Sequence, residues 1–409
     1  MVRTLTATNK MNILLLVDYY LPGTKSSAQL IHDLAAEFHL QGHKVIIVAP
    51  DSTLAGPLET SFEAGITVLR VRTGRLKEIS KVIRAINEAR LSSVIWKAGK
   101  DFFRANRCDL IVFYSPTIFF GKLVQKLKKL WNCKAYLILR DIFPQWAVDI
   151  GVLKEGPVCQ FFRHKERQQY KVADIIGVQS PGNLEYFTHR GLENKYKLEV
   201  LYNWISINGK KGVCQNDRAI LGLQDKIVFI YGGNIGIAQE MDNIVHLAMS
   251  MRDHSNIHFL LVGEGSEVPR LKAKIQENRL NNISIHPPVP QERYFGMLSE
   301  SDVGLISLNR KLTTHNFPGK MLGYMYSSMP ILASVNPGND LKQLLEESGA
   351  GFVCLSGEYD KFCNYALQLA TNAQLRRQMG RNASSILEKT FCVTRAASQI
   401  LSHLKEQPT

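Results

Sequence analysis

Thr314–Ser334, THNFPGKMLGYMYSSMPILAS, and Tyr231–Gln239, YGGNIGIAQ, share one local pattern. In each, a β-rich apolar run lies next to glycines or a proline, and the spacing predicts a helix that begins at the turn. The start of a helix offers free backbone N–H groups and a positive dipole end, which together favour phosphate. We expect Lys320 in the first turn of the second helix, where its ammonium adds a point charge. Two such turns about 80 residues apart predict one diphosphate-bearing ligand held by a single domain.

The rest of the chain alternates short apolar runs with amphipathic helical segments. Runs that are β-branched and nearly all apolar are typical of strands buried on both faces of a parallel sheet. They occur at 12–18, 44–49, 110–114, 134–139, 174–178 and 198–201, and again at 227–231, 257–262, 283–286, 303–306 and 331–333. The sequence therefore predicts an α/β protein with two Rossmann-like, doubly wound domains, whose ligands bind at the carboxyl ends of the strands and in the cleft between the domains.

A polar stretch without apolar periodicity, residues 203–225, marks the expected domain boundary. We expect a disordered extension at 1–10, an N-terminal Rossmann-like domain at 11–202 and a C-terminal Rossmann-like domain at 203–390. Residues 391–409 are expected to form a helix that packs back on the N-terminal domain. A length of 409 residues is ordinary for two domains.

Composition limits the class of protein. The absence of an apolar run of 18 residues or of a signal peptide argues against a spanning or secreted protein. Seven scattered cysteines with no C-x-x-C pair argue against a disulfide framework or a zinc site, and fit a cytoplasmic protein. The net charge of +14 is concentrated in residues 1–200, where 29 Lys and Arg face 18 Asp and Glu. Such a basic half predicts an anionic partner, either nucleic acid or a membrane surface.

Two basic stretches also carry apolar residues, Arg75–Arg107 and Gly121–Lys134. An apolar face flanked by Lys, Arg and Trp suits a helix lying in a membrane interface. The alternative is a helix that packs its apolar face in the core and leaves a solvated basic rim, and the sequence leaves both open. Neither stretch has an aromatic stacking platform or a recognisable nucleic-acid motif, so we expect no nucleic-acid partner.

Candidate site residues of the first domain follow its strands. Gly23 lies after the first strand, in a turn that either admits a ligand to the backbone or simply connects strand to helix. Arg140 and Asp141 end the strand at 134–139. Asp141 is expected to orient a hydroxyl or act as a base, and Arg140 to meet a phosphate. A salt-bridged loop is the alternative reading.

Candidate donor-binding residues of the second domain follow its strands in the same way. Glycines free the backbone for close approach, and amides supply neutral hydrogen-bond donors. The turn at 231–239 is not the dinucleotide fingerprint, because G-x-G-x-x-G is absent. The expected contacts are Gly233, Asn234, Gly236, Gln239, Glu264, Val289, His315, Phe317, Gly319 and Lys320.

These motifs resemble glycosyltransferase family 4, of the GT-B type, along nearly the whole chain. The resemblance rests on GGNIG-x-x-Q at 232–239, VGEG at 262–265, the PGK-x-x-x-YM…P segment at 318–330 and RD-x-x-P at 140–144. Within the family the chain is similar to the WbuB-like subgroup of O-antigen and capsule enzymes, L-fucosamine transferases among them. The resemblance implies transfer of a sugar from a UDP donor, UDP-N-acetyl-L-fucosamine, to an undecaprenyl-diphosphate-linked saccharide on the inner face of the bacterial cytoplasmic membrane.

Two departures from the family pattern bear on the site. The glutamate pair whose second carboxylate binds the donor ribose corresponds here to His315 and Gly323, which leaves Glu264 as a substitute. The Arg and Lys that bind diphosphate correspond to Asn234 and Gln239, so more of that task falls to Lys320. No D-x-D motif occurs, and we expect neither metal nor another cofactor. A GT-B sugar-nucleotide epimerase and a non-catalytic nucleotide-sugar-binding protein are the alternatives.

Overall fold

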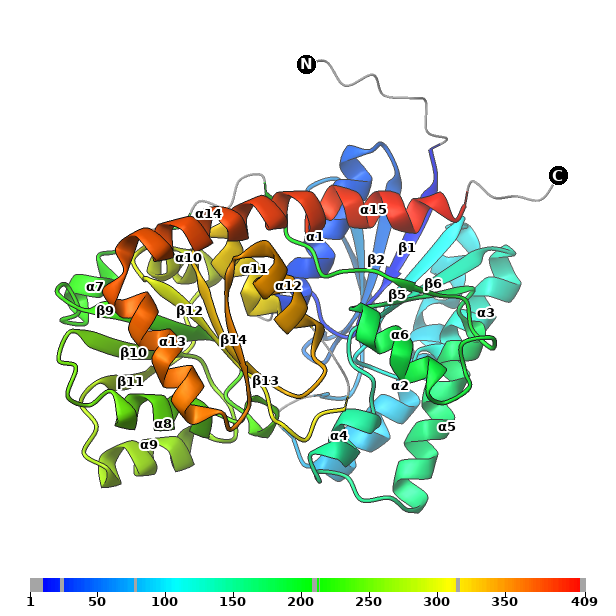
Figure 1. Cartoon of the computed structure of the whole chain (residues 1–409). Helices are drawn as coiled ribbons and strands as arrows, with labels where there is room; N and C mark the ends of the chain where they lie inside the picture. Colours follow the sequence, from blue (N-terminus) through cyan, green and yellow to red (C-terminus); the bar gives the residue numbers. More distant parts are fainter. Residues whose placement is uncertain are drawn as a thin grey trace. The chain divides into compact units, whose positions relative to one another are not determined.

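A computed structural model describes residues 10–22, 26–76, 79–207, 212, 214–313 and 317–404 (Figure 1). The chain divides into two compact units, each with its own sheet. The first unit consists of Met1–Val148, Leu153–Leu201 and Val393–Thr409, and the second of Asp149–Val152 and Tyr202–Cys392. The first unit is therefore assembled from segments that lie far apart in the sequence.

The sheet of the first unit has the strand order β3-β4-β2-β1-β5-β6-β7-β8. All neighbours are parallel except β3 and β4. The central strands are buried along nearly their whole length, as the continuous apolar runs predicted. The strands are β1 (Asn12–Leu16), β2 (Lys44–Asp51), β3 (Leu58–Glu63), β4 (Ile66–Arg72), β5 (Leu110–Tyr114), β6 (Lys134–Leu139), β7 (Ile175–Val178) and β8 (Leu198–Val200).

The β3–β4 hairpin was not predicted. Its turn is Ala64–Gly65, and both residues have positive φ, 48° and 84°. That conformation matches the twist of an antiparallel pair, but the sequence lacks the Asn-Gly or Asp-Gly signal that usually marks it. The outer strand, β3, is only partly buried, so it has no continuous apolar run. The hairpin extends the edge of the sheet away from the strands that position the site.

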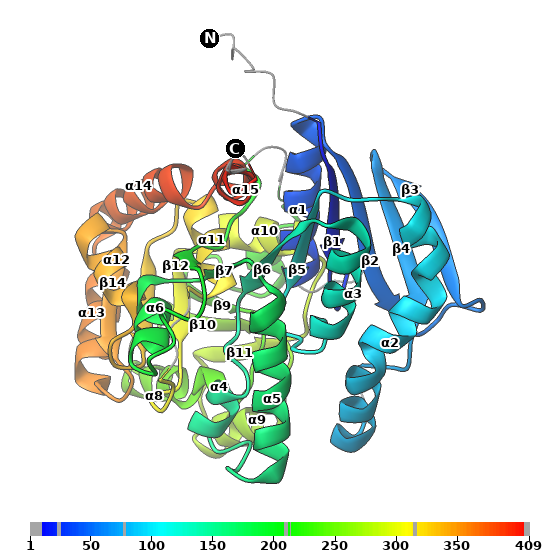
Figure 2. The ribbon, with the colours of Figure 1, turned by 90° about the vertical axis from the view of Figure 1, so that its right-hand side faces the viewer.

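Seven helices of the described chain accompany the first sheet, and Figure 2 shows α2, α3 and α5 beside it. The face of α3 formed by Leu123, Val124, Leu127 and Trp131 is buried, and the Trp131 indole donates to the Phe103 carbonyl at 2.9 Å. The apolar face of α3 therefore belongs to the core. The helices are α1 (Ser26–Leu40), α2 (Lys81–Ala105), α3 (Gly121–Trp131), α4 (Gln145–Asp149, whose last residue falls in the second unit), α5 (Pro157–Val172), α6 (Pro181–Thr188) and α15 (Val393–Ser402).

The second sheet is parallel throughout, in the order β11-β10-β9-β12-β13-β14. Its strands are β9 (Ile227–Gly232), β10 (Ile257–Val262), β11 (Ile283–His286), β12 (Val303–Ser307), β13 (Ile331–Val335) and β14 (Gly351–Leu355), of which β14 was not predicted. Its helices are α7 (Asp217–Ile220), α8 (Asp242–Ser250), α9 (Val268–Glu277), α10 (Gln291–Ser299), α11 (Gly319–Tyr326), α12 (Asp340–Ser348), α13 (Tyr359–Thr371) and α14 (Ala373–Thr390), with a 3₁₀ turn η1 at Ile237–Gln239.

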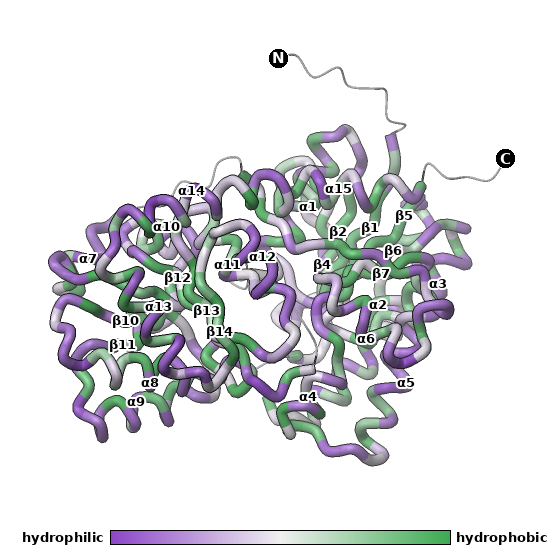
Figure 3. Tube along the Cα trace, in the orientation of Figure 1, coloured by the Kyte–Doolittle hydropathy of each residue, from purple (hydrophilic) through white to green (hydrophobic). Residues whose placement is uncertain are grey.

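Both sheets reverse their strand order once, and this places the candidate sites. In the first unit the chain winds outward from β1 in one direction and from β5 in the other. In the second unit the corresponding pair is β9 and β12. A crevice forms outside the carboxyl ends of the strands at such a switch point. The prediction of two doubly wound Rossmann-like units is confirmed, and Figure 3 shows the hydrophobic strands of each unit between more hydrophilic helices.

No helix in the described part of the chain is long and apolar enough to cross a membrane.

Candidate functional site

The glycine turn after β9 is held by backbone contacts with the loop after β10. The Gly233 amide donates to the Val262 carbonyl at 2.9 Å, and the Ile235 amide donates to the Glu264 carbonyl at 2.7 Å. Gly233 has a φ of 112°, which favours glycine. A Cβ on Gly263 would lie 1.9 Å from the Gly233 carbonyl oxygen, so the two loops touch backbone to backbone. The GGNIG and VGEG motifs thus form one rigid edge.

Asn234 and Gln239 bind each other inside this turn. The Asn234 side-chain amide donates to the Gln239 side-chain oxygen at 2.8 Å, and the Gly236 backbone N–H donates to the same oxygen at 3.1 Å. Gly233 and Asn234 are exposed, whereas Gly236 is buried. The predicted hydrogen-bond donors of the turn therefore lie together. Some of their hydrogen bonds are made within the turn and stabilise its conformation.

The prediction that a helix begins directly at the glycine turn is wrong. The turn is followed by the three-residue 3₁₀ segment η1, and α8 begins only at Asp242. The reason is Glu240, which has a φ of 41° and so ends η1 in the left-handed region. A single 3₁₀ turn carries little dipole, so an anion here would depend on backbone and side-chain donors.

Lys320 lies in the first turn of α11, which begins at Gly319 after Pro318. Its ammonium donates to the Tyr231 hydroxyl at 2.7 Å and lies 3.8 Å from the centroid of the Tyr231 ring. Burial lowers the pKa of Lys320 to about 7, because a desolvated ammonium is disfavoured. Among the residues that the structure describes, no carboxylate pairs with this ammonium. The helix start and the glycine turn are thus joined by one cation.

Two buried tyrosines, Tyr231 and Tyr324, tie the turn to the sheet, and no role was predicted for either from the sequence. Tyr231 donates its hydroxyl proton to the Asn234 carbonyl at 2.6 Å. The Tyr324 hydroxyl accepts from the Gly232 amide at 3.2 Å and donates to the Leu305 carbonyl at 3.1 Å. Both tyrosines are fully buried. The available signal was a tyrosine at the end of an otherwise apolar strand, because a buried hydroxyl needs a partner.

The other predicted donor-binding residues lie around this edge in different environments. Glu264 is exposed in the loop after β10, and Val289 is half-buried in the loop between β11 and α10. Phe317 is 3% exposed and packs against Tyr202 and Phe391, so its side chain belongs to the core rather than to a ligand surface. A donor contact at Phe317 would therefore have to come from its backbone, and its role stays a prediction. A Cβ on Gly319 would meet nothing within 4 Å, which leaves the start of α11 open. Gly23 and His315 lie outside the described residues.

The first unit brings polar residues together at the carboxyl ends of β1, β5 and β6. Arg140 is 4% exposed, and its guanidinium donates to the Leu201 carbonyl at 2.7 Å. Asp141 is half-buried, and the Ser115 hydroxyl donates to its backbone carbonyl at 3.4 Å. Burial and the nearby carboxylate of Asp18 raise the pKa of Asp141 to about 6, against a lowering by Arg140. A carboxylate with that pKa is suited to accept a proton near neutral pH.

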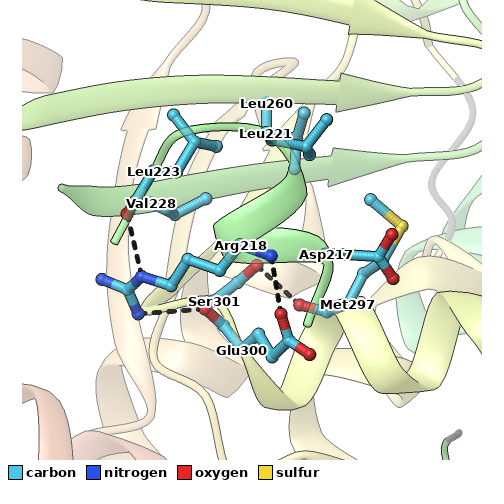
Figure 4. Close-up of a pocket in the computed structure, with 9 residues that line it drawn as sticks. All are labelled: Asp217, Arg218, Leu221, Leu223, Val228, Leu260, Met297, Glu300 and Ser301. Carbon is cyan, nitrogen blue, oxygen red and sulfur yellow. Dashed lines mark hydrogen bonds between the residues drawn. The ribbon is translucent and has the colours of Figure 1, made fainter. Parts of the chain in front are cut away.

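A small pocket of the second unit lies elsewhere (Figure 4). It contains Val228 near the start of β9 and Ser301 just before β12, so it lies at the amino edge of the sheet, opposite the glycine turn. Arg218 crosses it, with hydrogen bonds to the Glu300 and Leu223 carbonyls at 3.0 Å each. This pocket is part of the ionic packing of α7 and not of the candidate site. The described residues include no cluster of three or more His, Cys, Asp or Glu that could hold a metal.

The match to a known protein family lies within the second unit. Residues 214–385 match the family described as Glycosyl transferases group 1. WbjE of Pseudomonas aeruginosa, described as a glycosyltransferase, is 25% identical over 288 residues, which cover 69% of this chain and 70% of WbjE. WcaI of Escherichia coli K12, described as a colanic acid biosynthesis glycosyl transferase, is 25% identical over 260 residues, which cover 61% of this chain and 63% of WcaI.

Solved structures resemble nearly the whole chain. Sucrose-phosphate synthase from Thermosynechococcus elongatus has a TM-score of 0.75 at 14% identity, covering 97% of this chain and 99% of that chain. HepE of Anabaena, solved with UDP and glucose, has a TM-score of 0.71 at 16% identity, covering 97% of this chain and 100% of the HepE chain. At these identities the likeness shows the fold, and the predicted GT-B fold is confirmed.

Proposed function

We propose that this chain transfers a sugar from a UDP-sugar to a lipid-linked acceptor, because residues 214–385 match the group 1 glycosyl transferases. The donor diphosphate binds at the carboxyl edge of the second unit, between the glycine turn and the start of α11. HepE, whose structure resembles this chain, was solved with UDP and glucose, and this supports a UDP donor.

One observation carries the proposal: Lys320 is a desolvated cation without a carboxylate partner among the described residues. Burying a charge without an opposite charge costs free energy, and a protein recovers that cost when an anion binds. The ammonium lies at a helix start whose N–H groups also favour an anion. Lys320 and the α11 dipole would then stabilise the negative charge that grows on the departing diphosphate.

The acceptor side of the proposal rests on Asp141. A hydroxyl that attacks the sugar must lose a proton, and a carboxylate with a raised pKa accepts a proton more readily near neutral pH. The carboxylate follows β6, the strand next to the switch-point pair β1 and β5, near the crevice where ligands bind in doubly wound folds. We assign Asp141 to orienting or deprotonating the acceptor hydroxyl.

The proposed acceptor is an undecaprenyl-diphosphate-linked saccharide, and the proposed donor is UDP-N-acetyl-L-fucosamine. Support for the acceptor class comes from WcaI, whose description assigns it to colanic acid biosynthesis. Support for the donor is the sequence similarity to the WbuB-like subgroup carried by 137-LILRDIFPQWAVDIGVLK-154 and 315-HNFPGKMLGYM-325. The donor panel below tests this assignment.

A peripheral position on an anionic membrane completes the proposal. The first turns of α2 expose Ile83 and Ile86, and the first turns of α5 expose Val158 and Phe161. The Lys165 ammonium lies 5.4 Å from the centroid of the Phe161 ring. The nearby charge of Lys122 contributes to lowering the pKa of Lys165, after burial. Exposed apolar side chains beside like-charged lysines suit a surface of anionic lipid. We call Ile83, Ile86, Val158 and Phe161 the apolar tips.

The test is an incubation of purified protein with a panel of UDP-sugars, with and without a GlcNAc-diphosphate-lipid acceptor, followed by mass spectrometry of the released UDP. Acceptor-dependent release with UDP-N-acetyl-L-fucosamine is the expected result. Release with a different donor would correct the sugar and keep the class. Interconversion of the sugar without acceptor would identify an epimerase, and UDP binding without any turnover would identify a binding protein.

A further inference from the structure

We propose that Tyr231 is a positioning residue, which holds Lys320 in place through its hydroxyl and keeps the lysine charged for the incoming diphosphate. The proposal rests on the proposed function for the identity of the anion. The hydroxyl of Tyr231 is the only hydrogen-bond partner of the Lys320 ammonium among the residues that the structure describes. No role was predicted for Tyr231 from the sequence.

The direction of the two hydrogen bonds decides what Tyr231 can do. Its single hydroxyl proton goes to the Asn234 carbonyl at 2.6 Å, in the glycine turn. The oxygen therefore presents its lone pairs to Lys320, whose ammonium donates to it at 2.7 Å. An oxygen that only accepts from the ammonium favours the charged lysine over the neutral one. The same bond joins the two parts of the diphosphate site, the turn after β9 and the start of α11.

The ring of Tyr231 fixes the lysine side chain as well. The ammonium lies 3.8 Å from the ring centroid, within the range of a cation–π contact. The Tyr231 side chain itself cannot move, because it is fully buried at the end of β9. The Lys320 Cε would lie 3.7 Å from a Cβ on Gly233, so the lysine stem also passes close to the glycine turn. The lysine is thus ordered before any ligand binds.

The variant Tyr231→Phe tests the contribution of the hydroxyl separately from that of the ring. It removes the hydrogen bond and keeps the volume, the burial and the cation–π face. Tyr324→Phe is the matched control, because Tyr324 is an equally buried tyrosine that supports the same turn through Gly232 but does not contact Lys320. Loss of turn support alone would affect both variants, whereas loss of the lysine contact affects only Tyr231→Phe.

The first measurement needs no ligand. The rate at which acetic anhydride acetylates Lys320 is followed from pH 5 to 10 by mass spectrometry of the peptide that contains it. The unmodified protein is expected to show a midpoint near pH 7, Tyr324→Phe the same midpoint, and Tyr231→Phe a midpoint shifted to lower pH by about one pH unit, a tenfold change in the proton equilibrium. An unshifted midpoint in Tyr231→Phe would overturn the proposal, whatever the protein binds.

The second measurement is the dissociation constant of UDP between pH 6 and 9, obtained by calorimetry. In the unmodified protein the affinity should decrease as the pH rises through the pKa of free Lys320, because the neutral amine no longer attracts the diphosphate. In Tyr231→Phe this decrease should begin at lower pH, and the affinity at pH 7.5 should be about tenfold weaker, as expected for loss of a hydrogen bond to a charged group. No UDP binding by the unmodified protein would contradict the proposed function and leave the acetylation result to decide the role of Tyr231.

Discussion

At the scale of single residues, we expect the lysine of α11, Lys320, to be the most sensitive position. We expect Lys320→Ala to lower the turnover number on the order of 10²–10³-fold, because it removes a cation aimed at the leaving group. The fold should be preserved, since burial disfavours the charge of Lys320 in the folded protein. Steady-state kinetics and circular dichroism measure the two effects. Lys311→Ala, at an exposed lysine nine positions earlier, is the control, and near-normal turnover of Lys320→Ala would contradict the assignment.

The carboxylate of the first unit gives a prediction about pH. Its pKa is raised to about 6, so the folded protein binds the proton more tightly than the unfolded chain, and stability falls as the pH rises from about 4 to 6. Asp141→Asn removes this cost and should raise the free energy of unfolding at pH 7.5 by about 2 kcal/mol. Denaturant unfolding tests this, with Asp101→Asn on the exposed surface of α2 as control.

The same carboxylate should govern the acidic side of the activity profile. Turnover is expected to decrease below about pH 6 as Asp141 becomes protonated, and Asp141→Asn should lose about 10²-fold or more at neutral pH. Asp18→Asn removes a neighbouring negative charge, so it should shift the acidic limb to lower pH. A profile that stays flat down to pH 5 would exclude Asp141 as the base.

Residue patterns predicted some of these positions and missed others for a physical reason. The position of Lys320 in the first turn of a helix could be predicted, because a proline and a glycine mark the start of that helix. Tyr231 could not, because its role depends on a contact 89 positions away in the chain, and no local pattern encodes that distance. The core packing of the Phe317 ring was not predicted for the same reason, since its partners Tyr202 and Phe391 are remote in sequence.

At the scale of elements, the two basic stretches have separate outcomes. The apolar face of α3 is used by the core, so the interpretation of an interfacial helix fails for residues 121–131. The amphipathic pattern alone could not decide this, because a core-facing helix and a membrane-facing helix have the same periodicity. Along α2 the later apolar residues Leu91, Ile95 and Phe103 are buried, whereas Ile83 and Ile86 remain exposed.

The apolar tips of α2 and α5 predict where the protein meets a membrane. Replacing Ile83 and Ile86 together, or Val158 and Phe161 together, with serine should weaken binding to vesicles that contain anionic lipid by about tenfold. Co-sedimentation at fixed lipid concentration measures it. Leu40→Ser/Phe62→Ser is the matched control, because these side chains are 77% and 76% exposed but belong to the end of α1 and to β3. Equal loss in the control would show that the tips have no special role.

At the scale of the whole molecule, strand alternation predicted the two doubly wound units, and the comparisons bear that out. The continuous apolar runs sufficed because parallel strands are buried on both faces. The missed elements, β3, β4 and β14, contain polar residues or begin with glycine, so they carry no such run. Because strands and helices alternate along the chain, helices were expected beside each parallel sheet.

The C-terminal helix makes the first unit depend on residues far along the chain. Helix α15 packs against α1, and the Gln399 side chain donates to the Val200 carbonyl at 2.8 Å. Truncation after Cys392 should therefore lower the free energy of unfolding of the first unit by about 3 kcal/mol or more, since five apolar side chains lose their burial: Val393, Ala396, Ala397, Ile400 and Leu401. Urea unfolding measures it. Truncation after Leu404, which keeps α15, is the control. An unchanged urea midpoint in the protein truncated after Cys392 would contradict the prediction.

This discontinuity of the first unit has a consequence for biosynthesis. The ribosome delivers β1 before α15, with nearly the whole second unit between them. The second unit is contiguous apart from Asp149–Val152, so it can complete its core while translation continues. The first unit must wait with the α15-binding face of α1 uncovered. During synthesis the first unit is thus the later of the two to complete its core, and the α15-binding face of α1 is exposed to chaperones until α15 has been translated.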